Sequence, residues 1–565
     1  MSGILMMVIA IVVLGGAYLL YGRYLQNKWG IDPNAKTPAY EMEDGVDYVP
    51  ADTNVVFGHQ FASIAGAGPI NGPIQAAIFG WLPVLLWILI GGVFFGAVQD
   101  FASMYASVKN KGRTIGYIIE EYIGKLGKKL FLLFCWLFCI LVVAAFADVV
   151  AGTFNGFVAD DAGVVSKVAA NGAVATTSML FIVEAVALGC ILKYAKLNKW
   201  VNTAIAIVML VVAVALGLYF PMYLTRETWH ILIFIYILIA SVAPVTMLLQ
   251  PRDYLNSYLL IFMIAAAIVG VFVANPSCNL KAFTSFNVDG SYMFPILFVT
   301  IACGAVSGFH SLVSSGTTSK QLDKETDAKP IAYGGMLLEC VLAVLTLCAI
   351  GYAYKWNAVH PDQALKGATA IFGGGIAHMI DDIIPGSYSI LNSLLVLTYS
   401  AFCLTSLDTA TRLARFMFQE FWLEPGETAA DIKEGWKKVM VNPYFATILT
   451  VVLGILLGMN GYGKIWGLFG AANQLLAGIG LLAVATWLGN MGKNNKMFLI
   501  PMAFMIIVTI TSLALTVKNQ IGMIAAGGAD WGPWAQTILG VLLIVLAIVL
   551  VIEGVQTLRN PKKAA

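Results

Sequence analysis

The chain has 565 residues, of which 59% are hydrophobic and only 11% are charged, and its mean hydropathy is +0.83. This composition excludes a soluble globular protein and predicts an integral membrane protein built from α-helices. The net charge of +2 does not indicate a nucleic-acid partner, because the basic residues occur in short loops between apolar runs. Seven of the eight cysteines lie in apolar runs, so we predict no disulfide framework, and we also predict no metal and no cofactor.

Apolar runs long enough to cross a bilayer recur along the whole chain, and the first of them shows no cleavage signal. About 15 spans are predicted, at 3–21, 54–77, 81–107, 130–158, 176–193, 199–220, 229–249, 256–274, 293–316, 331–354, 388–416, 443–460, 464–487, 497–517 and 535–556. The segment Ala368–Ile384 is interpreted as a re-entrant or surface helix, because it is rich in glycine and ends in acidic residues.

Basic residues between the runs predict the orientation in the membrane. With 15 spans, the basic loops all fall on one side, including those with Lys109, Lys128, Lys196, Lys320 and Lys562–Lys563. The loop with Asp160 and Asp161 falls on the other side. We therefore expect the N-terminus outside the cell and the C-terminus in the cytoplasm. Three regions follow: an N-terminal helix and loop (1–52), a transporter core (53–487) and C-terminal helices with a short tail (488–565).

Phe61–Pro73 places three glycines and two prolines inside one of the predicted spans. Both residue types disfavour a helix interior. Inside a membrane, the freed backbone groups are tolerated only when they are buried in protein or line a wet cavity. The stretch therefore predicts a helix that is broken in the membrane and forms part of a ligand site.

A second glycine-rich stretch, Ile301–His310, resembles the first, since Ile64-Ala-Gly-Ala corresponds to Ile301-Ala-Cys-Gly-Ala. By the predicted topology, the two spans cross the membrane in opposite directions. This arrangement is typical of inverted repeats with paired broken helices. Two alternatives remain open: a chance similarity of small residues, and close helix packing at glycine.

Ionisable residues within spans are the candidates for proton coupling, because a charge in the membrane usually faces a cavity or a partner. Asp148 is our first choice, followed by His59 and Glu184. Each could instead be a packed, hydrogen-bonded structural group. Asp408 and Arg412 have ion-pair spacing on one helix and are predicted to form a structural pair.

Adjacent hydroxyls suggest a cation site, because hard cations prefer oxygen ligands. Thr405 and Ser406 could combine with the Phe402 carbonyl and with carbonyls of Ala62 and Ala65 near the first break. The alternative is that both hydroxyls bond back to their own helix. The pair Asn473-Gln474 is interpreted as a contact between helices.

No enzyme motif is present, since the chain lacks a phosphate-binding loop, a zinc-protease motif and a nucleophile elbow. Three long motifs (57–73, 303–320 and 406–415) resemble the carbon starvation protein A family, grouped with the amino acid–polyamine–organocation carriers. The resemblance implies two inverted five-helix repeats with two discontinuous helices. It also implies uptake of peptides or proton-driven import of pyruvate.

Under this resemblance, a small carboxylate would suit backbone N–H groups and hydroxyls near the two breaks. The predicted substrate-binding residues are Gly66, Ala67, Gly68, Asn71, Gly304, Ser307, Gly308, His310, Ser314 and Ser315. A peptide would also need a counter-charge, which Asp148 or Glu184 could supply. The sequence thus predicts a proton symporter of the bacterial inner membrane; a sodium-coupled carrier, a passive channel and a nutrient sensor are the alternatives, and the oligomeric state stays open.

Overall fold

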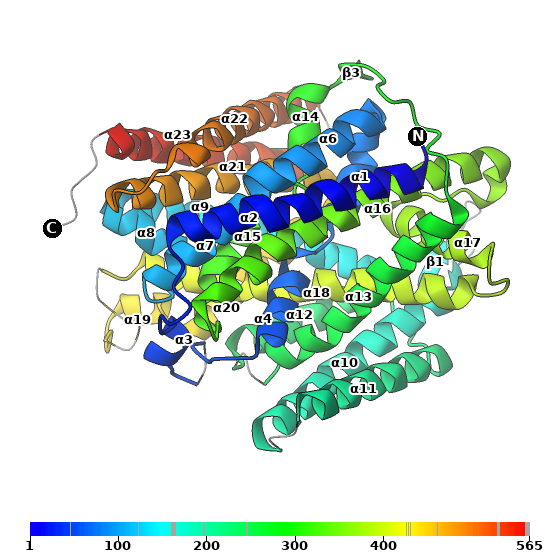
Figure 1. Ribbon diagram of the computed structural model, residues 1–565, viewed down its shortest axis with the longest axis horizontal. Coiled ribbons are helices and arrows are strands. Elements are labelled where there is room, and N and C mark those ends of the chain that lie inside the picture. Colours follow the sequence, from blue (N-terminus) through cyan, green and yellow to red (C-terminus); the bar gives the residue numbers. More distant parts are fainter. Residues whose placement is uncertain are drawn as a thin grey trace.

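The fold consists almost entirely of helices, most of which run roughly along the long axis of the molecule (Figure 1). The computed structural model describes the whole chain except residues 46, 123, 160–164, 196–197, 245–246, 425–426, 428, 430, 460, 528–530 and 560–565. The acidic loop at Asp160 and Asp161, and the basic residues Lys196, Lys562 and Lys563, therefore lie outside the described residues.

The first part of the chain contains an N-terminal helix, an interrupted helix and two long helices. The elements are α1 (Gly3–Gly16), η1 (Ala17–Tyr21), α2 (Gly22–Trp29), α3 (Pro38–Glu41), α4 (Thr53–Ile64), α5 (Gly68–Ala76), η2 (Ala77–Phe79), α6 (Trp81–Gly91), η3 (Gly92–Gly96), α7 (Ala97–Lys109), α8 (Ile115–Tyr122) and α9 (Lys125–Phe154). Here η1 joins α1 to α2, and η3 joins α6 to α7, so each set forms one long helix.

The middle part begins with a short antiparallel hairpin and contains the second interrupted helix. The elements are β1 (Phe157–Ala159), β2 (Val165–Lys167), α10 (Ala169–Tyr194), α11 (Lys199–Tyr219), α12 (Arg226–Val242), α13 (Leu249–Ala274), β3 (Asn287–Val288), β4 (Ser291–Tyr292), α14 (Met293–Thr300), α15 (Gly308–Gly316), η4 (Thr318–Lys320), η5 (Glu325–Asp327), η6 (Lys329–Gly334) and α16 (Gly335–Val359). The hairpins pair β1 with β2 and β3 with β4.

The last part holds the longest helix. The elements are η7 (Pro361–Gln363), η8 (Ala370–Gly374), α17 (Gly375–Asp381), α18 (Tyr388–Phe421), α19 (Trp436–Met440), α20 (Pro443–Gly458), α21 (Tyr462–Asn490), α22 (Lys496–Ala525) and α23 (Trp531–Arg559). Together, η8 and α17 extend only about 18 Å at 1.5 Å per residue, in keeping with the prediction that 368–384 does not span the membrane.

Eleven helices among the described residues are long and apolar enough to cross a membrane. They correspond to eleven of the fifteen predicted spans. Two of the other four predicted spans fall on the shorter helices α12 and α20. The remaining two fall on the interrupted helices α4–α5 and α14–α15. The chain is thus a multi-pass membrane protein, and the total of fifteen crossings stays a prediction.

Both predicted helix breaks are confirmed. The first helix stops at Ile64 and resumes at Gly68, and the intervening Ala65 has φ −75° and ψ 50°, outside the helical region. The second stops at Thr300 and resumes at Gly308. In the second break seven residues lie outside the helix, compared with three in the first.

The two interrupted helices run in opposite directions and are joined by backbone hydrogen bonds at both ends. Just before α4, the Ala51 N–H donates to the Gln321 carbonyl, which follows α15, at 3.1 Å. Just after α5, the Trp81 N–H donates to the Lys281 carbonyl, in the segment leading to α14, also at 3.1 Å. Each helix therefore starts beside the end of the other, which confirms the predicted opposite polarity.

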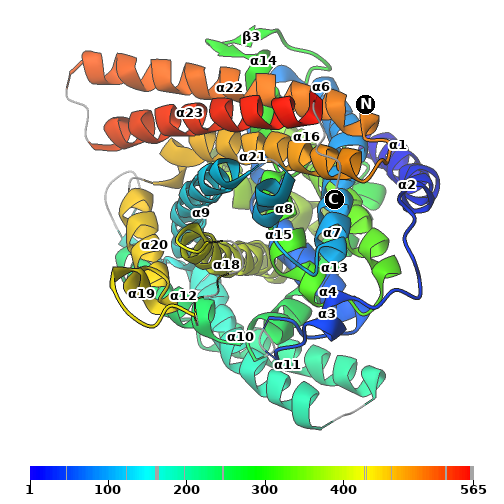
Figure 2. The ribbon, with the colours of Figure 1, turned by 90° about the vertical axis from the view of Figure 1, so that its left-hand side faces the viewer.

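The interrupted helices lie among α7, α13, α16, α18 and α21, as the view along the bundle shows (Figure 2). Helices α22 and α23 cover α21 on one side, and the α10–α11 hairpin lies on the opposite side. We call the end of the bundle that carries Lys109, Arg113, Lys128 and Lys320 the basic end, and the other the far end. The N-terminus lies at the far end and the C-terminus at the basic end (Figure 1).

Glycine permits the two interrupted helices to touch. A Cβ atom at Gly72 would lie 2.7 Å from the Thr300 carbonyl oxygen and 3.0 Å from the Ile301 Cα, both backbone atoms that cannot rotate away. We therefore expect Gly72→Ala to destabilise the protein by ~1–3 kcal/mol through overpacking. The matched control is Gly467→Ala, because no atom lies within 4 Å of its added Cβ.

Thermal unfolding of the two purified variants in the same detergent measures this difference. The melting temperature should fall for Gly72→Ala and stay at the wild-type value, or rise slightly, for Gly467→Ala. Equal melting temperatures for the two variants would contradict the close approach.

Candidate functional site

Side chains from α18 and α21 satisfy backbone groups at the two helix breaks. At the first break, the Ser406 hydroxyl on α18 donates to the Ser63 carbonyl at 2.9 Å. At the second, the Asn473 side-chain oxygen on α21 accepts the Phe309 N–H at 2.9 Å. Such partners are needed because unpaired backbone groups are costly in a membrane interior. Asn473 thereby caps α15 and confirms the predicted contact between helices.

Four of the predicted substrate residues lie where the two breaks meet. A Cβ at Gly68 would lie 2.6 Å from the Cys303 sulfur, and one at Gly66 would lie 2.8 Å from the Ser406 hydroxyl. Ala67 and Gly304 are buried in the same region, and a Cβ at Gly304 would approach the Ala343 Cβ to 2.9 Å. The backbone of the two breaks is therefore closely packed.

The other predicted substrate residues each have a side-chain or packing partner. The Asn71 amide donates to the Tyr399 hydroxyl at 3.1 Å. Ser307 and Gly308 pack against Asn473, which accepts the Ser307 hydroxyl proton at 3.2 Å. The residues Ser314 and Ser315 lie a turn or more further along α15, towards the basic end, where Ser314 accepts a hydrogen bond from Gln60 at 3.0 Å.

One hydroxyl of the predicted cation site, that of Ser406, lies at the first break. Thr405 is also buried, as are Ala62 and Ala65 at the broken end of α4, and Phe402 lies one turn before Ser406 on α18. The Asn256 amide on α13 donates to the Thr405 hydroxyl oxygen at 3.0 Å. This N–H donor uses an oxygen lone pair that a cation would need.

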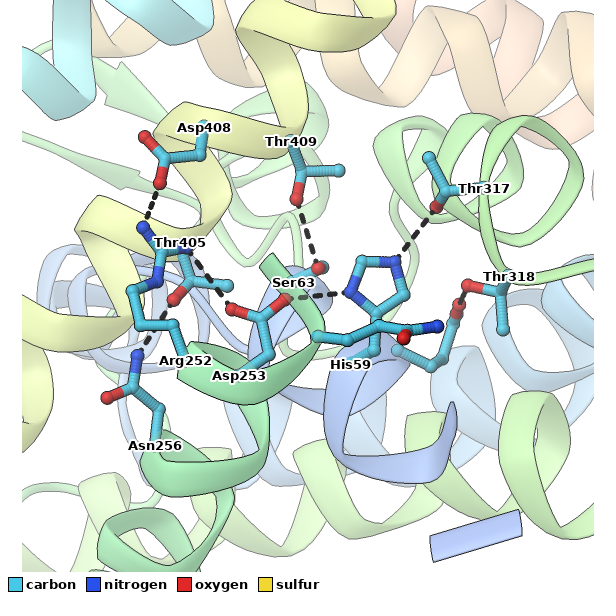
Figure 3. A network of polar contacts seen from close by, with 12 residues as sticks. His59, Ser63, Arg252, Asp253, Asn256, Thr317, Thr318, Thr405, Asp408 and Thr409 are labelled. Atoms are coloured by element: carbon cyan, nitrogen blue, oxygen red, sulfur yellow. Dashed lines mark hydrogen bonds and ion pairs between the residues drawn. The ribbon is translucent and has the colours of Figure 1, made fainter. Parts of the chain in front are cut away.

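A buried histidine–carboxylate pair joins the first interrupted helix to α13. The His59 Nδ1 atom lies 2.7 Å from an Asp253 carboxylate oxygen, and both side chains are fully buried. The other ring nitrogen of His59 lies 3.2 Å from the Thr317 hydroxyl, at the end of α15 (Figure 3). A titratable pair thus touches both interrupted helices, within the bundle.

The neighbouring Arg252 links this pair to an ion pair with α18. Arg252 contacts Asp253 at 3.2 Å and also binds the Asp408 carboxylate on α18 (Figure 3). The Tyr236 hydroxyl on α12 donates to the same carboxylate. Four helices therefore meet in one connected polar network within the bundle.

The predicted pair between Asp408 and Arg412 is wrong. Asp408 binds Arg252 instead, whereas the Arg412 guanidinium reaches Asp47, before α4, at 3.2 Å and donates to the Ala240 carbonyl. The spacing of four residues places both on one helix face, but each side chain binds a partner on another segment.

Asp148, our first choice for proton coupling, binds two partners on α12. Its carboxylate lies 2.6 Å from Arg226 and 3.2 Å from His230. Glu184 lies on α10 and is half-buried, and its Oε2 atom has no hydrogen-bond partner among the described residues. Of the three candidates, only His59 lies on an interrupted helix.

Asp148 and Arg226 line a cavity of about 390 Å³ at the far end, formed by α9, α10, α12 and α18. Thr153, Asn171 and Tyr399 also line it. Because Tyr399 binds Asn71 on α5, the cavity leads towards the first interrupted helix. A polar cavity of this size, with an exposed guanidinium, can admit a small carboxylate.

A second cavity, of about 270 Å³, opens at the basic end. It is lined by Tyr48, Arg113, Lys128, Lys320 and Glu420, and Lys128 binds Glu120 at 2.7 Å. Burial raises the pKa of the Tyr48 hydroxyl to about 12, so it stays protonated as a hydrogen-bond donor. The Tyr48 hydroxyl donates to the backbone carbonyl of Lys111.

Sequence reasoning missed Arg252 and Asp253 because the predicted span began at 256. In the structure α13 begins at Leu249, with Pro251 in its first turn, a position where proline is tolerated. A proline in the first turn was the available signal. Arg226 was missed in the same way, since α12 begins there rather than at 229.

Comparison with known proteins gives the family. The model of the family described as carbon starvation protein CstA matches residues 2–363 and 356–512. A peptide transporter, CstA of Bacillus subtilis (strain 168), is 32% identical over 98% of this chain and 97% of its own length. The pyruvate/proton symporter BtsT of Escherichia coli (strain K12) is 30% identical over 88% of this chain and 79% of its own length.

Among solved structures, that of MhsT in complex with L-phenylalanine matches with a TM-score of 0.50 at 13% identity. It covers 89% of this chain and 99% of that one, which shows similarity of fold only. The family match extends over most of the chain and includes both helix breaks. The protein therefore belongs to the carbon starvation protein CstA family of membrane transporters.

Proposed function

We propose that the protein is a secondary active transporter that imports pyruvate or small peptides across the bacterial inner membrane by proton symport with alternating access. The observation that carries the proposal is the buried pair of His59 and Asp253. The pair can bind or release a proton inside the membrane, and it touches both interrupted helices. Protonation there can change how the helices at the breaks are held together.

The packing supports a core of two inverted five-helix repeats. In this scheme α4–α5, α6–α7, α9, α12 and α13 correspond in order to α14–α15, α16, α18, α20 and α21. Contacts within one repeat have counterparts in the other. The packing of α4 on α13 corresponds to that of α15 on α21, and the packing of α5 on α16 corresponds to that of α15 on α7. The packing of α9 on α20 corresponds to that of α18 on α12. The hairpin α10–α11 is then an insertion, with α1–α3 before the core and α22–α23 after it.

Positive charge at the basic end supports an orientation with that end in the cytoplasm. The N-terminus would then lie outside the cell and the C-terminus in the cytoplasm. In that orientation the cavity at Arg226 opens to the outside, as an entry site for an imported substrate requires.

The far-end cavity supports a substrate that carries a carboxylate. The Arg226 side chain is 41% exposed and presents its guanidinium to the cavity beside Asp148. Pyruvate and peptides both carry a carboxylate that a guanidinium binds well. A peptide's ammonium group would find a counter-charge at Asp148.

The first test is transport by the purified protein in liposomes. We expect labelled pyruvate or dipeptide to accumulate when the outside is more acidic, because inward proton flow drives symport. Accumulation driven only by a sodium gradient would instead assign the coupling site to Thr405 and Ser406. Equilibration without accumulation would support a passive channel.

The second test concerns the coupling pair. We expect His59→Gln and Asp253→Asn each to abolish accumulation driven by a pH gradient while exchange of labelled for unlabelled substrate continues. His360→Gln is the matched control, because that histidine is exposed just after the end of α16. Full gradient-driven accumulation by His59→Gln would refute the assignment.

The third test concerns the entry cavity. It compares the KM for pyruvate of variants at Arg226 and at Asp148, the two partners of the ion pair. Arg226→Gln should raise the KM for pyruvate about tenfold, because a charge-assisted hydrogen bond is lost. Asp148→Asn should lower KM or leave it unchanged, since Arg226 then lacks a competing carboxylate. If both variants raise KM equally, the ion pair is structural and does not receive substrate.

A further inference from the structure

A second buried polar cluster lies at the other interrupted helix and takes no part in the mechanism proposed above. Cys303 lies in the break, His310 lies on α15, and Glu339 lies on the neighbouring α16. One ligand atom from each, the sulfur, a ring nitrogen and a carboxylate oxygen, lie within 4.8 Å of one another. All three side chains are buried.

The cluster contains buried polar atoms that lack partners. Neither carboxylate oxygen of Glu339 nor the Nε2 atom of His310 has a hydrogen-bond partner among the described residues. Buried polar atoms are rarely left in this state, because each unmade bond costs free energy. The unpartnered atoms of His310 and Glu339 face one another at 3.5 Å.

The remaining contacts resemble the outer shell of a metal site. The other ring nitrogen of His310, Nδ1, lies 2.9 Å from an Asp100 carboxylate oxygen on α7. This contact fixes the ring so that Nε2 is the free lone pair, as carboxylate–histidine–metal arrangements require. The Asn473 amide lies 3.7 Å from the Cys303 sulfur and donates to it, which stabilises a thiolate.

The spacing also agrees with metal coordination. Two ligand atoms bound at about 2.0–2.1 Å to one tetrahedral ion lie about 3.4 Å apart, close to the spacing between His310 and Glu339. A divalent ion with one thiolate, one carboxylate and one neutral imidazole is also uncharged overall, which lowers the cost of burial in a membrane.

We propose that Cys303, His310 and Glu339 form a binding site for a divalent transition metal, with Asp100 as the residue that positions His310. The mixed sulfur, nitrogen and oxygen donors favour Zn²⁺ or a neighbouring ion of the first transition row over Mg²⁺ or Ca²⁺. The ion would tie the unwound segment of the second interrupted helix to α16. Since a Cβ at Gly68 would approach the Cys303 sulfur to 2.6 Å, the site also adjoins the first break.

The test measures metal bound to the full-length protein, so it is independent of transport. The protein is produced in zinc-supplemented cells, purified without chelator and analysed by mass spectrometry for metals. We expect about one zinc per chain in the wild type and about a tenth of that in Cys303→Ser and His310→Gln. Cys348→Ser is the matched control: this cysteine is also buried, on the same helix as Glu339, and its sulfur contacts the Gly3 carbonyl.

Two further measurements guard against misfolding and adventitious metal. Protein produced with Co²⁺ should show a thiolate-to-cobalt absorption band in the wild type and Cys348→Ser, but not in Cys303→Ser. Added Zn²⁺ should raise the melting temperature of metal-depleted wild type but not that of the conservative variant Glu339→Gln. A cooperative melting transition of Glu339→Gln shows that the variant is folded. Absence of zinc from the wild type, or equal zinc in Cys303→Ser and Cys348→Ser, would overturn the proposal.

Discussion

The structure depends on one constraint: a helix that is broken inside a membrane must find partners for the backbone groups it releases. Specific side chains supply such partners. Ser406 donates to the carbonyl of Ser63, and Asn473 accepts the N–H of Phe309. Helices α18 and α21 therefore lie beside the breaks, and glycine at the breaks allows neighbouring segments to approach closely.

The same requirement governs the charges. The acidic groups described here each have a partner on another helix: Asp253 has His59, Asp408 has Arg252, and Asp148 has Arg226. Removing one partner of a buried pair leaves an uncompensated charge, which is strongly destabilising. Such pairs therefore hold helices in register.

Helix content, both breaks and their opposite polarity could be predicted from sequence, because glycine and proline within an apolar run rarely fit a continuous helix. Local spacing failed where partners come from distant segments. It paired Asp408 with Arg412, although Arg252 and Asp47 lie closer in space. It also placed Arg252 and Asp253 in a loop, because polar residues at a helix start lower the local hydropathy. Glu339 joins Cys303 and His310 from a different helix, α16, and no local spacing rule brings it to them.

The backbone bonds at the ends of the interrupted helices have a mechanical consequence. Ala51 is bonded to Gln321 at one end, and Trp81 to Lys281 at the other. Pulling the two helices apart would break these links, whereas tilting them together as one lever keeps both intact. The two helices also contact α18, where the Ser406 and Thr409 hydroxyls bind Ser63 at the broken end of α4. Any motion of these helices past α18 must therefore replace the hydrogen bond that satisfies the released Ser63 carbonyl.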